Sequence, residues 1–294
     1  MQEIRPLRES DRDDILEIAK RTWEGHDYLP YSFEAWIEDN NSHTAAIEQD
    51  GHVVALANLR VIENGKTGWM EGLRVHPDYR GKGFAKKLTN HVVQAAIDLQ
   101  LKRIRYTTAT LNIESLHLGE KVGMERKFDL AVSWHAGPGE ISWRSSTEPI
   151  KEVTPAQLHP NLVDSGLLPH NVIVYDWKAL DATPEALDKI GQNARFWVQV
   201  QGDAIKSFSL GLARNASEGP QWAFTIYASS ESGFLDHVSH HIAMASDNKC
   251  KSMFGAFQKE FSDIFYGLDW AKHEEDEGDE EAEEFALTLL ERVL

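Results

Sequence analysis

The sequence predicts an α/β protein, of the α+β kind, that is divided into two domains. Its length of 294 residues favours two domains over one. Apolar segments of strand length are joined by tight turns such as Asp50-Gly51, a strong signal for antiparallel hairpins. The stretch from Trp69 to Leu88 has the pattern of a strand, a glycine-rich turn and a helix in succession. Together these patterns indicate mixed, mostly antiparallel sheets that are covered by helices.

The bulk composition is that of an ordinary globular protein, and it excludes several classes of function. A net charge of −17 argues against nucleic acid as a partner, because duplex binding needs a basic surface. No run approaches the roughly 18 apolar residues that a membrane span needs. The single cysteine, Cys250, excludes an internal disulfide and a cysteine metal cluster. We therefore expect a soluble, cytoplasmic protein without a membrane partner, and the oligomeric state stays open.

Apolar periodicity assigns the elements of the first half in order. Ser10 and Ser32 are the expected N-caps of the first two helices, and Gly123 is expected to end the last one. The expected elements are strand 3–7, helices 11–23 and 33–38, strands 43–48, 52–62 and 69–75, helix 83–100, strand 102–109, helix 112–122 and strand 128–134.

The turn Arg80-Gly81-Lys82-Gly83 lies where the central strand ends and the long helix begins. The first N–H groups of a helix lack internal partners, and the helix dipole adds positive character there. Glycines let the backbone approach a phosphate group closely, so this terminus suits a phosphate. The alternative is an ordinary helix start with two surface cations. The spacing is not that of a nucleotide P-loop, which needs Gly-Lys-Ser/Thr after four spacer residues.

The residues around this turn carry a resemblance to a known family. Arg80-x-x-Gly83-x-Ala85, after a strand that ends Leu73-Arg74-Val75-His76-Pro77, resembles the acetyl-CoA signature Q/R-x-x-G-x-G/A of the GNAT N-acetyltransferases. About the first 135 residues fit the element order of that fold, in which acetyl-CoA enters a split in the sheet. A narrower resemblance, to the vertebrate histidine N-acetyltransferases, rests on Asp27-Tyr28-Leu29-Pro30, Glu71-Gly72-Leu73-Arg74-Val75, Leu167-Leu168-Pro169 and Asp176-Trp177.

The resemblance implies that acetyl-CoA, with no metal, is the acetyl donor. The backbone of Leu73 and Val75 would pair with its pantetheine arm, and the N–H groups from Gly81 to Ala85 would hold its pyrophosphate. Asn112 would touch the pantetheine or cap the helix that follows it, and both roles are compatible. The cofactor residues expected in this way are Leu73, Arg74, Val75, Arg80, Gly81, Lys82, Gly83, Phe84, Ala85 and Asn112.

Glu71 is the residue that the resemblance implies as the catalytic base, which takes a proton from the acceptor amine directly or through water. Strand alternation places Glu71, Leu73 and Val75 on one face of the sheet and Arg74 on the other. The oxyanion donor would be a backbone N–H near Leu73, beside a β-bulge. In the alternatives, Glu71 holds the ammonium of the acceptor, or it is a structural carboxylate that pairs with Arg74 or Arg60.

The residue that would protonate the departing thiolate is missing from its family position. The family pattern Asn-x-x-Ala-x-x-Leu-Tyr begins at Asn112 and places Gly119 where the tyrosine stands. Tyr28, Tyr106 and solvent remain as candidate proton donors.

Substrate contacts are expected from the loop between the first two helices, where the family varies. Asp27 and Tyr28 lie there, and with Glu71 they are the expected substrate-binding residues. The expected acceptor is the amine of a small molecule, with free histidine as the specific candidate. In the alternative for this loop, Tyr28 packs over Pro30 and Asp27 is a turn residue. The alternatives for the whole chain are a non-catalytic acyl-CoA-binding module and an acetyltransferase that acts on protein N-termini or lysines.

The second half echoes the first in outline. We expect a GNAT domain at 1–136, a linker at 137–152 and a second GNAT-like domain at 153–294. The expected elements of this domain are helical pieces after 154 and 160, strands 172–177, 196–201, 205–212, 222–228 and 252–257, and helices 183–190 and 233–245. Residues 285–294 are either a strand or a helix, and the pattern favours a strand. No glycine-rich turn follows strand 222–228, so we predict a degenerate half that does not bind the cofactor. The acidic run 274–284 is expected to be a solvated loop.

One further motif in the second half has the spacing of a metal site. His237-x-x-His240-His241 places two histidines one helical turn apart, a spacing that can bind zinc. No third ligand is evident, so a polar helix face is the expectation. The nearby aromatic residues Trp197, Trp222, Phe224 and Phe234 are expected to pack in the core.

Overall fold

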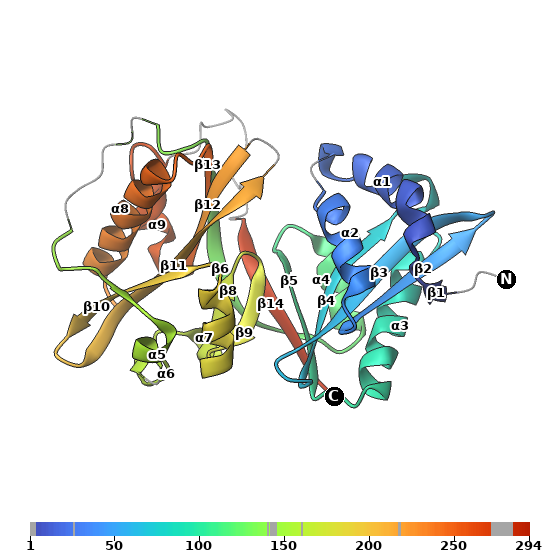
Figure 1. Cartoon of the computed structure of the whole chain (residues 1–294), viewed down its shortest axis with the longest axis horizontal. Coiled ribbons are helices and arrows are strands. Elements are labelled where there is room, and N and C mark those ends of the chain that lie inside the picture. Colours follow the sequence, from blue (N-terminus) through green and yellow to red (C-terminus); the bar gives the residue numbers. More distant parts are fainter. Residues whose placement is uncertain are drawn as a thin grey trace. The chain divides into compact units, whose positions relative to one another are not determined.

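The chain divides into two compact units (Figure 1). The computed structural model describes residues 4–25, 27–139, 141, 146–159, 161–216, 219–271 and 285–294. Unit 1 comprises Met1–Tyr106, Asn112–Arg126 and Leu289–Leu294, and unit 2 comprises Thr107–Leu111 and Lys127–Thr288. Each unit therefore takes in chain from both halves of the sequence. The contiguous domains 1–136 and 153–294 stay a prediction, and the acidic run 274–284 and linker residues 140 and 142–145 lie outside the described residues.

Unit 1 is a mixed, mainly antiparallel sheet with helices. Its strands are β1 (Ile4–Pro6), β2 (Ser42–Gln49), β3 (His52–Ile62), β4 (Thr67–Val75) and the start of β5 (Arg103–Ala109). Its helices are α1 (Arg12–Lys20), α2 (Leu29–Glu38), α3 (Phe84–Asp98) and α4 (Ile113–Lys121). Strands β1 to β4 pair antiparallel in sequence order, and β4 pairs in parallel with β5. The predicted fold class is confirmed.

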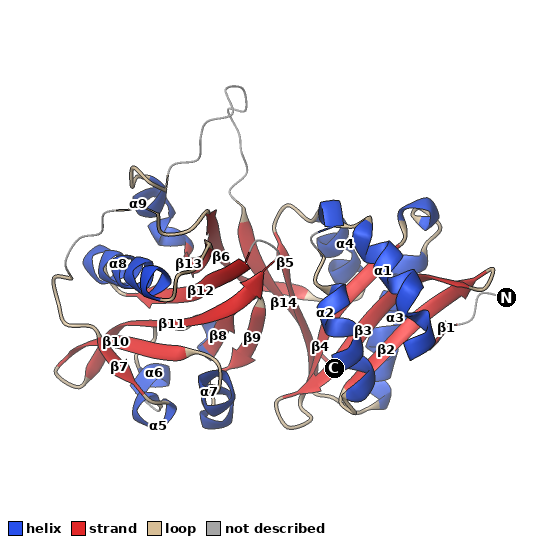
Figure 2. Cartoon of the chain, turned by 45° about the horizontal axis from the view of Figure 1, so that its top comes forward, coloured by secondary structure: helices blue, strands red, loops and turns tan. Residues whose placement is uncertain are grey.

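The two faces of the unit 1 sheet carry separate hydrophobic cores (Figure 2). Helices α3 and α4 cover one face, where Phe84, Leu88 and Leu116 are buried. Helices α1 and α2 cover the other face, where Ile15 and Phe33 are buried. The apolar residues of α3 recur every three or four positions, so one stripe of the helix meets the sheet. Both faces of β4 are therefore covered by helices. Its edge toward β5 is the part of the strand that differs from a regular sheet.

Helix α2 begins earlier than the sequence pattern predicts. It starts at Leu29 with Tyr28 as its N-cap residue, so the expectation of a cap at Ser32 is wrong. Pro30 lies in the first turn, where its missing N–H costs no hydrogen bond and its fixed φ favours helix. The loop expected at 24–30 is therefore shorter, and Tyr28 is held at a helix terminus.

The strands of unit 2 lie side by side in the order β6-β13-β12-β11-β10-β7. Its strands are β6 (Glu125–His135), β7 (Lys151–Val153), β10 (Arg195–Gln201), β11 (Ala204–Ala216), β12 (Gly219–Ala228) and β13 (Ser252–Gln258). Its helices are α5 (Pro155–Leu158), α6 (Asn161–Asp164), α7 (Pro184–Gly191), α8 (Glu231–Asp247) and α9 (Ser262–Tyr266). The expected strand 172–177 is a hairpin of β8 (Val172–Tyr175) and β9 (Lys178–Asp181), which turns at Asp176 and Trp177 with φ of 44° and 63°.

The order of elements in unit 2 repeats that of unit 1. Strands β10, β11 and β12 pair antiparallel, α8 follows, and β13 then pairs in parallel with β12. Strands β2, β3 and β4, helix α3 and strand β5 have the same succession in unit 1. The predicted second, GNAT-like half is therefore present. The final strand, β14 (Ala286–Val293), begins in unit 2 and ends in unit 1.

Two bulk expectations concern membranes and metals. No helix within the described ranges is long and apolar enough to cross a membrane. Among those same residues, no group of three histidine, cysteine, aspartate or glutamate side chains is placed to hold a metal ion.

Candidate active site

A β-bulge in the central strand β4 shapes the candidate site. Between Glu71 and Arg74, β4 has two residues, Gly72 and Leu73, where β3 has one. Gly72 has a φ of +68°, in the left-handed region that favours glycine. A Cβ atom at this position would lie 2.2 Å from Cη2 of Trp36. Glycine is therefore required on two counts, and the bulge expected near Leu73 is present.

The bulge reverses the alternation of side chains along β4. Leu73 and Val75 pack against the core beneath α3. Glu71 bonds to Asn58, which lies on the opposite face, the one covered by α1 and α2. Arg74 lies on the Glu71 face as well, because it bonds to Asp27 ahead of α2. The expectation that Glu71 shares a face with Leu73 and Val75 is wrong, since one extra residue between them shifts the pleat by one position.

Strands β4 and β5 separate halfway along β4. Their ladder covers only Thr67 to Trp69 of β4, opposite Arg103 to Arg105 of β5. From residue 70 to Val75, β4 has no strand beside it on that edge among the described residues. Its backbone groups on this edge can therefore pair with an extended ligand, as in strand addition.

The glycine turn ahead of α3 is open to ligands. Gly81 and Gly83 have φ of +75° and +80°, and a Cβ atom at either position would meet nothing within 4 Å. No side chain of a described residue caps the helix. Arg80 and Lys82 are exposed on either side of Gly81. The unpaired N–H groups and the two cations make this turn suitable for an anion.

A buried ion pair lies beside the bulge. Arg74 donates from Nε and Nη2 to the two carboxylate oxygens of Asp27, at 2.8 and 3.1 Å. The Asp27 side chain has no exposed surface. The guanidinium of Arg74 lies 4.1 Å from the ring centroid of Trp23 and 5.2 Å from that of Tyr28. Asp27 therefore acts on the site through Arg74 and the two rings.

The hydroxyl of Tyr28 is fixed at the bulge. It accepts a hydrogen bond from the backbone N–H of Gly72, at 3.0 Å. The Tyr28 residue is 39% exposed, so the ring also presents surface to ligands. Loss of hydration raises the pKa of the Tyr28 phenol, and the charge of Arg74 opposes this rise. The phenol is therefore protonated at neutral pH, and its O–H remains available as a donor.

Glu71 carries no ion pair within the described part of the chain. Its Oε1 accepts a hydrogen bond from Nδ2 of Asn58, at 3.0 Å. Arg74 is engaged by Asp27, and Arg60 is engaged by Asp39 at 2.8 Å. The alternative in which Glu71 is a structural partner of one of these arginines is therefore wrong. A half-buried carboxylate without a cation is suited to an ammonium ligand or to a proton from one.

Comparison with known proteins assigns the part of the chain that carries this site to a family. Residues 12–124 match the model of the Acetyltransferase (GNAT) family. These residues belong to the GNAT family. The match covers the bulge, the separated strands and the open glycine turn of unit 1.

Curated relatives and a solved structure extend the comparison. Histidine N-acetyltransferase from Xenopus tropicalis is 26% identical over 212 residues, which cover 65% of this chain and 63% of the relative. Histidine N-acetyltransferase from Scomber australasicus is 40% identical over 77 residues, 26% of this chain and 23% of the relative. A tandem GNAT protein from the clavulanic acid biosynthesis pathway, solved without AcCoA, aligns with a TM-score of 0.60 at 12% identity and covers all of this chain and 98% of that one. The chain thus spans less than two thirds of the curated relatives, and the structural likeness shows the fold.

GNAT acetyltransferases use acetyl-CoA, and the residues of unit 1 fit it. The open turn at Gly81 and Gly83 would receive a pyrophosphate, and the free edge of β4 would receive the pantetheine arm. Asn112 caps α4, where its side chain accepts a hydrogen bond from the Ser115 N–H at 3.2 Å. The capping role of Asn112 is therefore present.

Gly119, at the position of the family tyrosine, faces the core. A Cβ atom there would lie 2.3 Å from the hydroxyl of Tyr106 and 3.0 Å from Cδ2 of Leu290. The Tyr106 hydroxyl donates to the Ser115 carbonyl at 2.7 Å, and burial raises the pKa of this phenol. Packing therefore excludes a larger side chain at position 119. The hydroxyl proton of Tyr106 is engaged in a hydrogen bond with the Ser115 carbonyl.

In unit 2, the strand edge that corresponds to the open edge of β4 is paired with another strand. Strands β12 and β13 pair over six positions, from Gln221 to Ile226 of β12. Beyond them, Oε1 of Gln258 accepts a hydrogen bond from the Ala228 N–H at 2.7 Å. Helix α8 is capped by Ser230, which accepts from the Gly233 N–H at 3.2 Å. Both features that would hold acetyl-CoA in unit 1 are thus occupied by the protein itself in unit 2.

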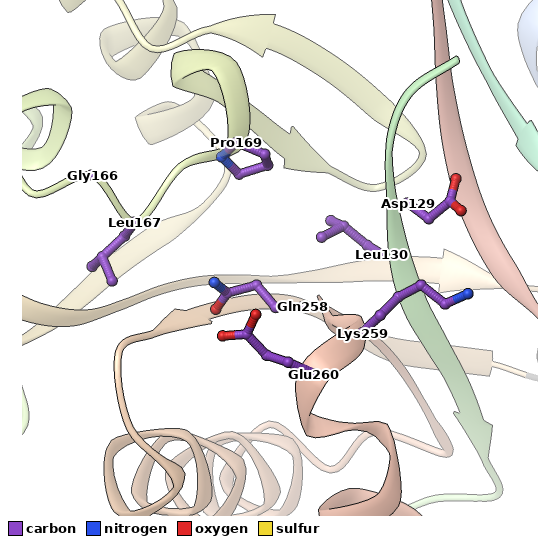
Figure 3. Close-up of a pocket in the computed structure, with 8 residues that line it drawn as sticks. All are labelled: Asp129, Leu130, Gly166, Leu167, Pro169, Gln258, Lys259 and Glu260. Atoms are coloured by element: carbon purple, nitrogen blue, oxygen red, sulfur yellow. The ribbon is translucent and has the colours of Figure 1, made fainter.

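A cavity of about 420 Å³ lies elsewhere in unit 2 (Figure 3). Leu167 and Pro169 face the polar ends of Gln258 and Glu260 across it. Its lining is completed by Asp129, Leu130, Gly166 and Lys259. It lacks the open helix start and the free strand edge that distinguish unit 1.

His237 and His241 of α8 are buried and His240 is half-buried, so the expectation of a polar helix face is wrong. His237 contacts the hydroxyls of Ser209 and Ser207 with its two ring nitrogens, at 2.7 and 3.0 Å. His241 stacks on Phe224 with 4.6 Å between ring centroids. Burial lowers the pKa of His237 to about 3, so its ring is neutral. The aromatic residues expected in this core, Trp197, Trp222, Phe224 and Phe234, are buried as predicted.

Sequence reasoning missed three residues of the site. Trp23 and Trp36 contact Arg74 and Gly72 respectively, but neither belongs to a recognisable motif. Asn58 did leave a signal, because it is the single polar residue in the apolar run from Val53 to Leu59. A polar side chain in a buried strand requires a partner, and here the partner is Glu71.

Proposed function

We propose that the chain is an acetyl-CoA-dependent N-acetyltransferase whose acceptor is the amine of a small molecule. The observation that supports this most is the open, left-handed glycine turn at the start of α3, beside a strand whose edge is free. Glu71, a carboxylate without a cation, lies on that same strand. Acetyl-CoA, when bound, supplies the activated acetyl group, and the chain supplies binding, orientation and proton transfer.

The cofactor residues are proposed as the sequence predicts them. The N–H groups from Gly81 to Ala85 bind the pyrophosphate, with charge from Arg80 and Lys82. The backbone of residues 73–75 pairs with the pantetheine arm, and Arg74 contributes through its backbone because its side chain is engaged by Asp27. Phe84 anchors the start of α3 in the core. Asn112 orders the helix that borders the split.

The acceptor residues are proposed on the face of β4 that carries Glu71. Glu71 binds the ammonium of the acceptor and accepts its proton, directly or through water. The rings of Tyr28 and Trp23 are partly exposed nearby and suit a flat or cationic group. Asp27 contributes by holding Arg74 in place. The N–H of Leu73 stabilises negative charge that develops during transfer.

Free L-histidine is the specific acceptor that we propose. The relatives from Xenopus tropicalis and Scomber australasicus carry histidine in their names. An imidazole ring can stack on the aromatic rings ahead of α2 while its amino group meets Glu71. A free amino acid is small enough to use this face without the extended contacts of a peptide.

A panel of amines tests the proposal. Release of free thiol from acetyl-CoA is measured with the 20 amino acids, polyamines and short peptides that carry a free N-terminus or a lysine, and calorimetry measures acetyl-CoA binding. Fast release with histidine supports the proposal. Binding of acetyl-CoA without any release selects the non-catalytic acyl-CoA-binding module. Release with peptides alone selects an enzyme for protein N-termini or lysines.

Two matched glycine variants test the cofactor site. Gly83→Ala places a Cβ atom in the space proposed for phosphate, and we expect the Kd of acetyl-CoA to rise at least about tenfold, or 1.4 kcal/mol. Gly51→Ala is the control, because Gly51 also has positive φ and open space but lies in the β2–β3 turn. Equal affinities in the two variants would contradict the placement of the pyrophosphate.

A further inference from the structure

A row of polar side chains crosses three strands beneath α1 and α2. Thr44 of β2 lies opposite Asn58 of β3, and Asn58 lies opposite Glu71 of β4. Asn58 is 1% exposed and bonds to both neighbours. On one side of the row the flanking residues Leu56 and Ala46 are apolar and buried, and on the other side lie Ser42 and Arg60. An amide in such a place is costly unless every polar atom has a partner.

The hydrogen bonds of the row fix which way the amide of Asn58 points. The hydroxyl of Thr44 donates to Oδ1 of Asn58, at 3.0 Å. The amide nitrogen is therefore turned toward Oε1 of Glu71, at 3.0 Å, and toward the hydroxyl of Ser42, at 3.4 Å. A flipped amide would place its oxygen against the Glu71 carboxylate, which only accepts hydrogen bonds, whereas the Thr44 hydroxyl could serve either end of the amide. The hydrogen bonds of the row thus have one favourable arrangement. The last of them is donated to the carboxylate of Glu71.

The row leaves one oxygen of Glu71 for a ligand. Oε1 is held by Asn58, whereas Oε2 accepts no hydrogen bond from any described residue. Stability alone does not account for this arrangement, because replacing a buried hydrogen-bonded pair by apolar groups of the same shape is often neutral or stabilising. A carboxylate with one oxygen anchored and the other free is what positioned proton transfer needs, since small misplacements cost large factors in rate.

We propose that Asn58, oriented by Thr44, is a positioning residue for Glu71 in acetyl transfer. This inference rests on the proposed function, because it takes Glu71 as the group that meets the acceptor amine. Asn58 holds Oε1 and thereby directs Oε2 toward the acceptor. Thr44 acts one step further away, because its hydroxyl holds Oδ1 of Asn58 and so limits movement of the amide that bonds to Glu71.

Asn58→Asp tests this role with almost no change of shape. Two carboxylates at hydrogen-bond distance share a proton, which must leave before Glu71 can accept another. We expect the acid limb of the pH–rate profile to move to higher pH by about one unit or more. The free protein provides a readout without turnover. In protein labelled with ¹³C-glutamate, the carboxyl signal that disappears in Glu71→Gln should titrate at higher pH in Asn58→Asp than in the unmodified chain.

Thr44→Val is the milder variant if Asn58→Asp fails to fold. It removes one hydroxyl, and we expect turnover to fall roughly tenfold with the Kd of acetyl-CoA unchanged. Thr89→Val is its matched control, because among the described residues the buried Thr89 hydroxyl bonds only within α3, to the Ala85 carbonyl at 2.9 Å. Unmodified chain that is silent with every amine would refute the proposed function. Active chain whose pH profile and Glu71 titration are unmoved by Asn58→Asp would refute the role of Asn58 alone.

Discussion

Gly72→Ala should be among the most damaging single-methyl changes in unit 1. At a φ of +68°, a side chain costs about 1–2 kcal/mol through the left-handed backbone. The new Cβ atom would lie 2.2 Å from Cη2 of Trp36, and relieving such overpacking costs about 1–3 kcal/mol more. We therefore expect the free energy of unfolding to fall by about 2–5 kcal/mol. Activity should fall as well, because the bulge also sets the position of Glu71.

Gly65→Ala separates the two contributions. Gly65 has a φ of +80° in the β3–β4 turn, and a Cβ atom there meets nothing within 4 Å. Gly65→Ala should lower the free energy of unfolding by about 1–2 kcal/mol, which is the cost of the left-handed backbone alone. Urea denaturation, followed by tryptophan fluorescence and by hydrogen exchange of β4 amides, measures both variants. Trp36→Phe removes the Cη2 atom and should recover part of the excess cost of Gly72→Ala. Equal costs for Gly72→Ala and Gly65→Ala would refute the reasoning.

Three further changes test other parts of the structure. Arg74→Gln leaves the fully buried carboxylate of Asp27 without its cation and should cost about 3–5 kcal/mol in urea denaturation; a loss below 1 kcal/mol would show that the pair is solvated. Because burial holds the pKa of His237 at about 3, the unfolded chain binds a proton below about pH 6.5 that the folded chain does not. Stability should therefore fall as pH drops below 6.5, by up to about 1.4 kcal/mol per pH unit, and denaturation midpoints between pH 7 and 4 that do not decline would contradict the burial. Gly119→Ala places a Cβ atom 2.3 Å from the Tyr106 hydroxyl and should cost about 1–3 kcal/mol, which Tyr106→Phe in the same chain should largely restore if the contact is the cause.

Local features of the fold could be predicted from sequence, because local chemistry decides them. The Asp50-Gly51 turn and the glycines before α3 need conformations that few other residues adopt, and both are where the pattern places them. The helix α3 follows from its apolar spacing. These signals involve residues within a few positions of one another, so they can be recognised without knowledge of long-range contacts.

Contacts across the sheet could not be predicted in this way. The family resemblance implies a bulge near Leu73, but the pattern of this strand alone does not show where its alternation shifts and which face each side chain takes. The partner of Asp27 is Arg74, 47 residues later in the chain. The two residues meet only because α2 packs against the face of the sheet that carries Arg74. The expectation for Asp27 as a ligand residue took its position in the loop into account but not this distant cation.

The composition of unit 1 has a consequence for how the chain is made. Its core includes Leu290, and Glu291 bonds to Arg105 at 2.6 Å, so the segment Leu289–Leu294 completes a unit whose other segments are Met1–Tyr106 and Asn112–Arg126. After α4 is synthesised and before Leu289 is added, the nascent chain contains α1 to α4 but lacks the part of β14 that belongs to unit 1. Expression of residues 1–136 alone should therefore yield protein that aggregates, because it lacks the segment Leu289–Leu294 of unit 1.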